Sequence, residues 1–433
     1  MLLRLQLLLN FLTHYPLYNK SLTFGLLNLS FFIARRYLVN QKGTFSFIIR
    51  LAVLATALSI AVMIIAMAVV TGFEAVIKEK LFNFMGHVHI SYFDPSKSNT
   101  RTVPPIYMDK KLVASIQGIP HVKRVIPFIQ RPVIVQSRGR MEGIGLKGVD
   151  KDYHFPPGIS LAGKAITYPD SAYSKDILLS ERTASRLDVT AGDTVQLEFI
   201  DETAVPRVRK VKIAGLYHSG MEDVDKYYAI CDIRLLQRLN NWSADSINAY
   251  QIDLDNEYYA DTVANYIHYN LIKAPLECNT TVENFPAIFD WLNVQNLDCK
   301  VLLIIMAIVS IINLAAVLLM LMVDRAAMIG LLKTLGMSFN NTIAVFLNIG
   351  AIIGAAGIAA GNIFALALCG IQQKFKIITL PEDTYFMKYA PVKIVWWHII
   401  TIDIAALALF VFCMWLPALY IRTIQPAKVL QFK

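Results

Sequence analysis

Two stretches of the chain carry residue types and spacings that could do chemistry, but neither completes a site. Gly158 begins and Lys164 ends a G-x-x-x-x-G-K string, the front of a phosphate-binding loop. The next residue is Ala165, so the hydroxyl that would bind magnesium is missing and we expect no nucleotide site. His87 and His89 are predicted to share one face of a strand, with no third ligand nearby in sequence. We interpret them as strand residues and not as a metal site.

Other signatures of catalysis are missing. The sequence contains no G-x-S-x-G and no H-E-x-x-H. Its five cysteines form no C-x-x-C pair, and they are Cys231, Cys278, Cys299, Cys369 and Cys413. This pattern indicates neither a disulfide framework nor a zinc site. We predict a chain that is not an enzyme and that needs no cofactor or metal.

The composition indicates a membrane protein. Hydrophobic residues make up 55% of the 433 residues, charged residues only 17%, and the mean hydropathy is +0.48. A soluble domain carries about a quarter charged residues. Four apolar runs reach or exceed the roughly 20 residues that a membrane helix needs, and they are Leu51–Val70, Val301–Val323, Ile343–Ile371 and Ile399–Ile421. We predict four transmembrane helices.

One acidic residue, Asp403, lies in the fourth apolar run. Acids inside membrane helices often mark ion pathways. Trp396 and Trp397 lie close by and are typical of the membrane–water interface. We therefore expect Asp403 to be a hydrated acid near the headgroups.

The charge distribution predicts the topology. Residues 1–50 carry six Lys or Arg and no acid, whereas residues 71–300 carry 26 bases against 28 acids. Basic residues also predominate after the second run and in the tail. By the positive-inside rule, both termini lie in the cytoplasm and residues 71–300 lie outside. The net charge of +9 thus reflects topology and does not indicate nucleic-acid binding.

The segment between the first two runs has the pattern of a mixed α/β domain. Alternating apolar residues predict strands, which are His87–Tyr92, Val133–Gln136, Ile144–Lys147, Gly192–Ile200, Lys210–Leu216 and Asn248–Leu254. Capping residues and periodicity predict helices, which are Asp109–Gln117, Ser180–Leu187, Ile233–Leu239, Asn256–Leu271 and Phe285–Lys300, the last continuing into the second run. A polar hairpin tip is expected at Asp201, Glu202, Ala204, Val205, Pro206 and Arg207. On the residues alone, an ordinary hairpin loop is the safer interpretation of this segment.

A short helix is predicted between the second and third runs. Met328, Ile329, Leu332 and Leu335 recur at helical spacing, and Gly336 is typical of a helix stop. This apolar face either docks into a groove of a partner or lies on lipid. The third run then contains small residues that favour close helix packing, at Gly350, Gly354, Gly357 and Gly361.

Several motifs together resemble a known family. They are FIARRYL before the first run, TGFE and GHVHI after it, SERTASRL with AGD, YHSGMEDVDKYYAICD, MIGLLKTLG, LPEDTYF with APVKIVWW, and the terminal IQPAKVLQF. Over residues 30–433 the chain resembles the permease subunits of lipoprotein-releasing ABC transporters (LolC/LolE) within the FtsX/MacB-like superfamily.

The resemblance implies a fold, partners and a location. The fold would be an α-helical integral membrane protein of four transmembrane helices, with a large mixed α/β periplasmic domain between helices one and two. Partners would be cytoplasmic ABC ATPase subunits, a second permease copy or paralogue, lipoprotein cargo, a periplasmic carrier and membrane lipids, with no nucleic acid. The location would be the bacterial inner membrane. Arg325, Lys333 and the apolar residues up to Gly336 would form the ATPase coupling helix, and the 201–207 hairpin would contact the carrier.

These expectations assign a role to each segment. They are an N-terminal extension (1–29), a cytoplasmic amphipathic helix (30–50), transmembrane helices (51–73, 297–323, 341–373 and 396–421), a MacB-like periplasmic core (74–296), a cytoplasmic coupling helix (324–340), a periplasmic loop (374–395) and a cytoplasmic tail (422–433). The alternatives are an FtsX-like permease that regulates cell-wall hydrolases and a MacB-like export permease. A proton-driven secondary carrier fits less well, because four unequal spans around one large domain show no inverted repeat.

Overall fold

The computed structural model describes residues 31–32, 34, 36, 44–93, 104–153, 155, 159–170, 172–199, 207–324, 328, 330–331 and 334–420. The chain divides into two compact units. The helical unit comprises residues 1–66, 301–368 and 395–433, and the α/β unit comprises residues 67–300 and 369–394. The segment between the third and fourth apolar runs, residues 369–394, therefore belongs to the α/β unit.

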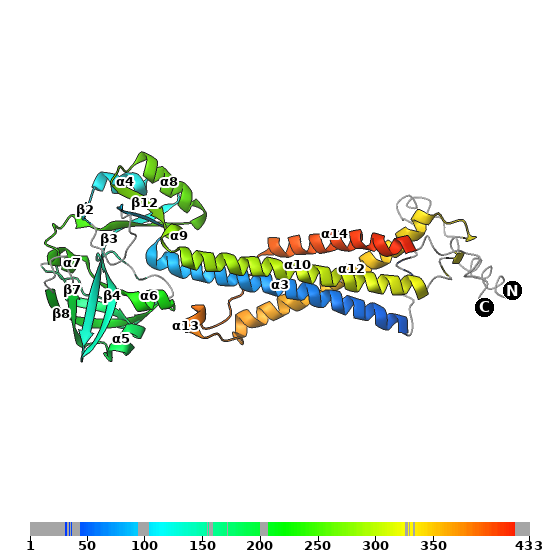
Figure 1. The fold of residues 1–433 in the computed structure, drawn as a ribbon, viewed down its shortest axis with the longest axis horizontal. Coiled ribbons are helices and arrows are strands. Elements are labelled where there is room, and N and C mark those ends of the chain that lie inside the picture. Colours follow the sequence, from blue (N-terminus) through cyan, green and yellow to red (C-terminus); the bar gives the residue numbers. More distant parts are fainter. Residues whose placement is uncertain are drawn as a thin grey trace, which may run out of the picture. The chain divides into compact units, whose positions relative to one another are not determined.

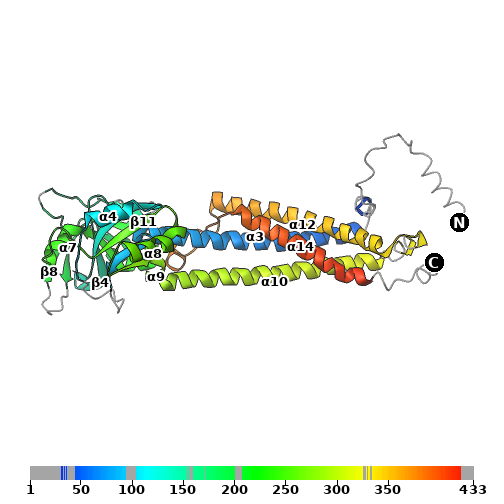
Figure 2. The same ribbon diagram turned by 90° about the horizontal axis from the view of Figure 1, so that it is seen from above.

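Long helices account for the described part of the helical unit (Figures 1 and 2). They are α3 (Thr44–Met85), α10 (Pro286–Asp324), α12 (Phe339–Phe375) and α14 (Trp396–Tyr420). Three stretches are long and apolar enough to cross a membrane, Ile49–Met85, Pro286–Val323 and Asn341–Phe375. The fourth expected span appears among the described residues as a shorter apolar helix, Trp396–Phe412. Each of α3, α10 and α12 contributes residues to both units without a break.

A ten-stranded sheet forms the centre of the α/β unit. Its order is β12-β1-β11-β3-β4-β9-β6-β8-β5, with β7 paired to β3 and β8. The strands are β1 (Val88–Tyr92), β3 (Val122–Ser137), β4 (Arg140–Val149), β5 (Ser160–Gly163), β6 (Asp176–Ser180), β7 (Thr194–Phe199), β8 (Arg207–His218), β9 (Tyr228–Asp232), β11 (Ala249–Leu254) and β12 (Leu276–Thr280). A separate pair joins β2 (Ile106–Tyr107) to β10 (Ser246–Ile247). The first half of β3 pairs with β11 and its second half with β4 and β7, so β3 joins the two halves of the sheet.

Short helices complete the α/β unit. They are α4 (Lys110–Gln117), α5 (Glu181–Leu187), α6 (Glu222–Tyr227), α7 (Ile233–Leu239), η1 (Glu257–Tyr259), α8 (Ala260–Asn270), α9 (Thr281–Asn284) and α13 (Glu382–Tyr385). Helix α8 packs on β12 and β1, whereas α5 and α7 pack on β4 (Figure 1).

Local sequence signals account for most element positions, and the six predicted strands are confirmed. The helix starts are confirmed as well, because Asp109, Ser180 and Asp232 cap α4, α5 and α7 through their side chains. The helix expected at Asn256–Leu271 is divided into η1 and α8, since the Asn256 side chain caps the 3₁₀ turn first. The helix expected from Phe285 into the second apolar run is the continuous α10.

One apolar cluster of the α/β unit joins elements from distant parts of the chain. It contains Ile77 and Phe84 of α3, Phe289 of α10, Tyr217 of β8 and Met387 of the 369–394 segment, all nearly inaccessible to solvent. The α/β ends of α3 and α10 are therefore built into a core of this unit.

Candidate functional site

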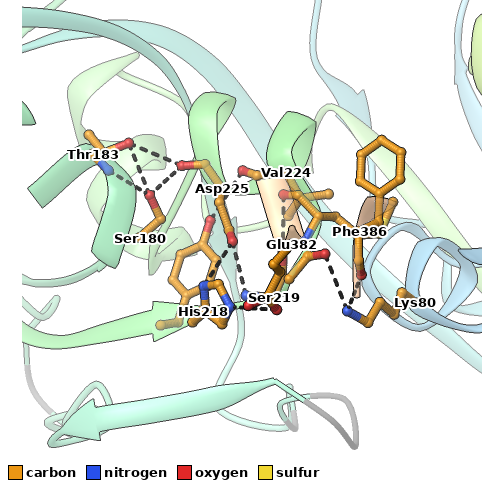
Figure 3. A network of polar contacts seen from close by, with 12 residues as sticks. Lys80, Ser180, Thr183, His218, Ser219, Val224, Asp225, Glu382 and Phe386 are labelled. Atoms are coloured by element: carbon orange, nitrogen blue, oxygen red, sulfur yellow. Dashed lines mark hydrogen bonds and ion pairs between the residues drawn. The ribbon is translucent and has the colours of Figure 1, made fainter. Parts of the chain in front are cut away.

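A polar network ties residues 369–394 to the rest of the α/β unit (Figure 3). His218 Nε2 lies 2.9 Å from Glu382 Oε1, and His218 Nδ1 lies 3.3 Å from Asp225 Oδ2. Lys80 of α3 donates from Nζ to the carbonyl oxygens of Phe386 (2.7 Å) and Gly220 (3.2 Å). We name His218, Asp225, Glu382 and Lys80 the latch.

Each latch residue is held by its own element. His218 is the last residue of β8, Asp225 lies in α6 and Glu382 begins α13. The backbone N–H of Ser219 donates to Asp225 Oδ1 at 3.0 Å. The hydroxyls of Ser180 and Thr183 both donate to the Asp225 backbone oxygen. Asp225 is thus held through its carboxylate by Ser219 and through its backbone oxygen by Ser180 and Thr183.

The electrostatics of the latch depend on one imidazole between two carboxylates. A neutral imidazole donates from only one ring nitrogen, so hydrogen bonds with both acids require either an imidazolium that donates twice or a protonated acid that donates to the other ring nitrogen. Burial raises the pKa of the Asp225 carboxyl, partly opposed by its bonds to Ser219 and the nearby His218. Lys388 adds a positive charge 3.6 Å from Glu382 Oε2.

A polar cavity of about 460 Å³ adjoins the latch. Most of its lining residues are acids and bases, and they come from α5, β8, α6, α13 and the turn between β8 and α6, namely Glu181, Arg182, Ser185, Arg186, His218, Gly220, Glu222, Asp225 and Glu382. Arg182 and Glu222 pair at 2.7 Å across this lining. Among the described residues, no group of three or more His, Cys, Asp or Glu side chains could hold a metal ion.

A second joint holds the C-terminal end of α3. Lys147 of β4 donates from Nζ to the Phe84 carbonyl (2.9 Å) and to Gln251 Oε1 (2.8 Å). Thr281 donates from its hydroxyl to the Gly86 carbonyl at 2.6 Å, which connects the end of α3 to the start of α9. A cation at a helix C-terminus interacts favourably with the exposed carbonyls. Burial lowers the pKa of Lys147 to about 8.

The two expected strand histidines have separate environments. His87 precedes β1, stacks on Phe82 and accepts the Leu254 N–H on Nδ1. His89 lies inside β1, where burial and the nearby Lys147 charge lower the pKa of His89 to about 3. Neither belongs to a metal-binding group among the residues that the structure describes.

Two glycine-rich strings resemble nucleotide-binding motifs but coincide with strands in the structure. Gly158 lies outside the described residues, and Ala162–Gly163 end β5. A G-x-G-x-x-G string from Gly143 to Gly148, which motif reading missed, lies wholly inside β4. A dinucleotide site needs these glycines at a strand-to-helix turn, so this string does not form one.

The predicted coupling helix is described only in part. Met328 is helical and half-buried, Leu335 is 76% exposed, and Gly336 has φ of +86°. Positive φ is typical of the glycine that follows a helix. Arg325, Ile329, Leu332 and Lys333 lie outside the described residues.

The predicted hairpin is described only at its last residue. Asp201, Glu202, Ala204, Val205 and Pro206 lie outside the described residues. Arg207 begins β8 and donates from Nη1 to the Leu239 carbonyl at 2.7 Å.

The predicted glycines of α12 are in close contact with neighbouring helices. A Cβ on Gly357 would lie 2.7 Å from Thr56 Cβ, and one on Gly361 would lie 2.7 Å from the Ala57 carbonyl oxygen, both in α3. A Cβ on Gly354 would lie 3.0 Å from the Phe410 ring of α14. Gly350, one turn earlier, is buried.

Asp403 has a partner that the sequence did not indicate. Asn362 of α12 donates from Nδ2 to Asp403 Oδ2 at 2.7 Å, and Asp403 Oδ1 is inaccessible to solvent. The acid lies in a helix–helix contact of the helical unit, where the residue as a whole is half-buried. Sequence reasoning missed Asn362 because it lies 41 residues away.

Comparison with known proteins places these features in a family. The model of the MacB-like periplasmic core domain matches residues 50–268, about half of the chain, and that of the FtsX-like permease C-terminal domain matches residues 300–426.

Two curated relatives match almost the whole chain. The lipoprotein-releasing system transmembrane protein LolC of Xylella fastidiosa (strain Temecula1) is 25% identical over 422 residues, covering 94% of this chain and 99% of the relative. LolE of Haemophilus influenzae (strain Rd) is 23% identical, covering 93% and 99%. The periplasmic region of MacB from Actinobacillus actinomycetemcomitans is 11% identical over 47% of this chain and 92% of that structure, with a TM-score of 0.32. The chain belongs to the family with a MacB-like periplasmic core domain, here followed by an FtsX-like permease domain, and is an ABC permease related to LolC and LolE.

Proposed function

We propose that this chain is the permease subunit of an ABC transporter that releases lipoproteins from the inner membrane to a periplasmic carrier. A separate cytoplasmic ATPase would supply the energy. The similarity to LolC and LolE along almost the whole chain supports this proposal. The second permease is either another copy of this chain or a paralogue.

The proposed membrane arrangement follows from charge and apolar length. Helices α3, α10, α12 and α14 cross the membrane, both termini lie in the cytoplasm, and the α/β unit lies in the periplasm. The three long apolar helices and the basic residues before Leu51 support this orientation.

Release of a lipoprotein requires work. Each buried methylene of an acyl chain contributes about 0.8 kcal/mol to membrane binding, so several chains together hold the cargo firmly. We propose that ATP-driven motion of the coupling helix passes through the membrane helices to the α/β unit and expels the cargo.

One structural observation carries this mechanism. Parts of α3, α10 and the 369–394 segment share one apolar core of the α/β unit. In the latch, Glu382 of α13 pairs with His218 of β8, and His218 also pairs with Asp225 of α6. Lys80 of α3 donates to the carbonyl oxygens of Phe386, which follows α13, and of Gly220. Movement of any of these helices would therefore displace the α/β domain and not only a loop.

The coupling helix provides a direct test. Replacing Leu332 and Leu335 by Asp should abolish co-purification of the ATPase, because both changes place charge on the proposed docking face. Ile377→Asp is the control, since Ile377 is also exposed (65%) but lies in the α/β unit. Unchanged co-purification after the double substitution would contradict the docking assignment.

The cargo is tested by depletion of the chain in cells. Lipoproteins should then accumulate in the inner membrane. Correct lipoprotein sorting together with defective cell separation would instead support an FtsX-like signalling permease, and loss of export of small molecules or peptides would support a MacB-like exporter.

Deletion of residues 201–206 should weaken carrier capture if the hairpin contacts the carrier.

A further inference from the structure

Two polar side chains of the helical unit face each other with an incomplete set of hydrogen bonds. Asn362 of α12 donates from Nδ2 to Asp403 Oδ2 of α14 at 2.7 Å. The remaining oxygens, Asn362 Oδ1 and Asp403 Oδ1, are both inaccessible to solvent and have no hydrogen-bond partner. Both are acceptors when Asp403 is ionised, so neither can satisfy the other.

One proton on Asp403 gives both unpaired oxygens a hydrogen bond. A protonated Oδ1 can donate to Asn362 Oδ1 while Asn362 Nδ2 donates to Oδ2, which gives two reciprocal bonds between a carboxyl and a carboxamide. Turning the amide over does not remove the need for the proton, because it would bring two oxygens to 2.7 Å.

The described membrane helices of the helical unit offer this pair no compensating charge. Residues 339–373 of α12, residues 51–73 of α3 and residues 301–323 of α10 contain no Asp, Glu, Lys or Arg. On α14 the nearest titratable residue is His398, five positions before Asp403. A lone carboxylate among such helices is costly. A divalent cation needs six or more oxygen ligands, and this pair has two unused ones.

We propose that Asp403 and Asn362 form a proton-binding site, in which a carboxylic acid–carboxamide pair joins α14 to α12. In water an aspartate loses its proton well below neutral pH. Separation of the two helices in the presence of water therefore releases the proton. By linkage, low pH favours the joined helices and high pH favours their separation. This site is independent of the identity of the cargo and of the ATPase.

The proton is tested by infrared spectroscopy of the full chain in lipid nanodiscs at neutral pH. The wild type should show the carbonyl band of a protonated carboxylic acid, and Asp403→Asn should lose that band. The Asp403→Asn chain should remain folded, because two facing carboxamides exchange the same two bonds. Asn362→Leu should shift the band to higher frequency, since the carboxyl then loses its partner. Asp290→Asn, at an exposed position of α10, is the control and should leave the band unchanged.

A missing band in the wild type, or a band that persists in Asp403→Asn, would overturn the proposal. A carboxylate signal that responds to sodium would do so as well, because it would assign a cation to the site.

The linkage is tested by spin labels at Phe364 of α12 and Leu407 of α14, which are both exposed. The fraction of molecules with a long distance between the labels should rise with pH in the wild type and stay constant in Asp403→Asn. A pH-independent distance in the wild type would contradict the linkage. ATPase and lipoprotein assays play no part in either experiment, so these results are separate from the proposed transport function.

Discussion

Lys147 is a buried lysine whose environment shifts its pKa. Its amine is 1% exposed and lies 5.1 Å from the ring centroids of Phe84 and Phe128. Two carbonyl acceptors and these rings replace part of the water that the charge loses on folding. The charge remains costly, which is why its pKa falls to about 8 from 10.5.

We predict that Lys147→Met removes a specific pH dependence of stability. Between pH 8 and 10.5 the unfolded chain holds the lysine proton and the folded chain does not. The folded wild type therefore gains stability as pH rises through this window, by up to about 3 kcal/mol at 1.36 kcal/mol per pKa unit. Pulse proteolysis of the detergent-solubilised chain measures it. An identical pH profile in Lys147→Met would contradict the assignment.

Single substitutions test whether the latch holds α13 in place. Glu382→Gln or His218→Gln removes a charged contact that links α13 to β8. This contact is partly exposed, so we expect a loss of about 1 kcal/mol, or roughly fivefold faster amide exchange in α13. Hydrogen-exchange mass spectrometry measures this effect. The control is His121→Gln, because His121 forms a comparable pair with Asp255 at 3.1 Å elsewhere in the unit. Equal exchange in all these variants would mean that the latch does not hold α13.

At the scale of elements, the close packing of helices in the helical unit depends on glycines, which have no side chain. Gly361 allows α12 to approach α3 so closely that an added methyl would lie 2.7 Å from the Ala57 carbonyl oxygen and 2.9 Å from Ile60 Cβ. Backbone atoms cannot move aside cheaply, so this contact requires glycine.

We predict that Gly361→Ala destabilises the chain by about 1–3 kcal/mol, as overpacking generally does. Gly370→Ala is the matched control on the same helix, because nothing lies within 4 Å of its added Cβ. That substitution should be neutral or stabilise by up to about 1 kcal/mol, since alanine favours helix more than glycine. Thermal unfolding in detergent compares the two. Similar midpoints for both variants would show that α3 and α12 do not pack tightly at Gly361.

At the scale of the whole molecule, the charge distribution predicts on which side of the membrane the α/β unit and the proposed coupling helix lie, and cysteine labelling tests this prediction. Asn270 of α8 and Thr334, in the proposed coupling helix, are both exposed. We predict that a membrane-impermeant maleimide labels Asn270→Cys in intact spheroplasts and labels Thr334→Cys only after permeabilisation. The wild-type chain is the control, because its cysteines at 231, 278, 299 and 369 are buried. The reverse pattern would place the α/β unit in the cytoplasm and contradict the proposed mechanism.

The sequence by itself determined the elements and the class of protein. Apolar run length predicted the long helices, and alternation predicted strands such as His87–Tyr92, which the structure shows as β1 (Val88–Tyr92). The caps Asp109 and Ser180 marked helix starts correctly. These features are readable because each depends on residues within a few positions of one another.

Only the tertiary structure decided which distant residues meet. His218 and Glu382 are 164 positions apart, and both lie in motifs that carry the family resemblance, yet neither motif indicates the other as its partner. Lys147 looks like an exposed strand lysine until the end of α3 is placed against it. The sequence around Asp403 does not indicate its amide partner, because Asn362 lies on another helix. Such contacts depend on strand order and helix packing, which bring together segments whose local sequences are independent of each other.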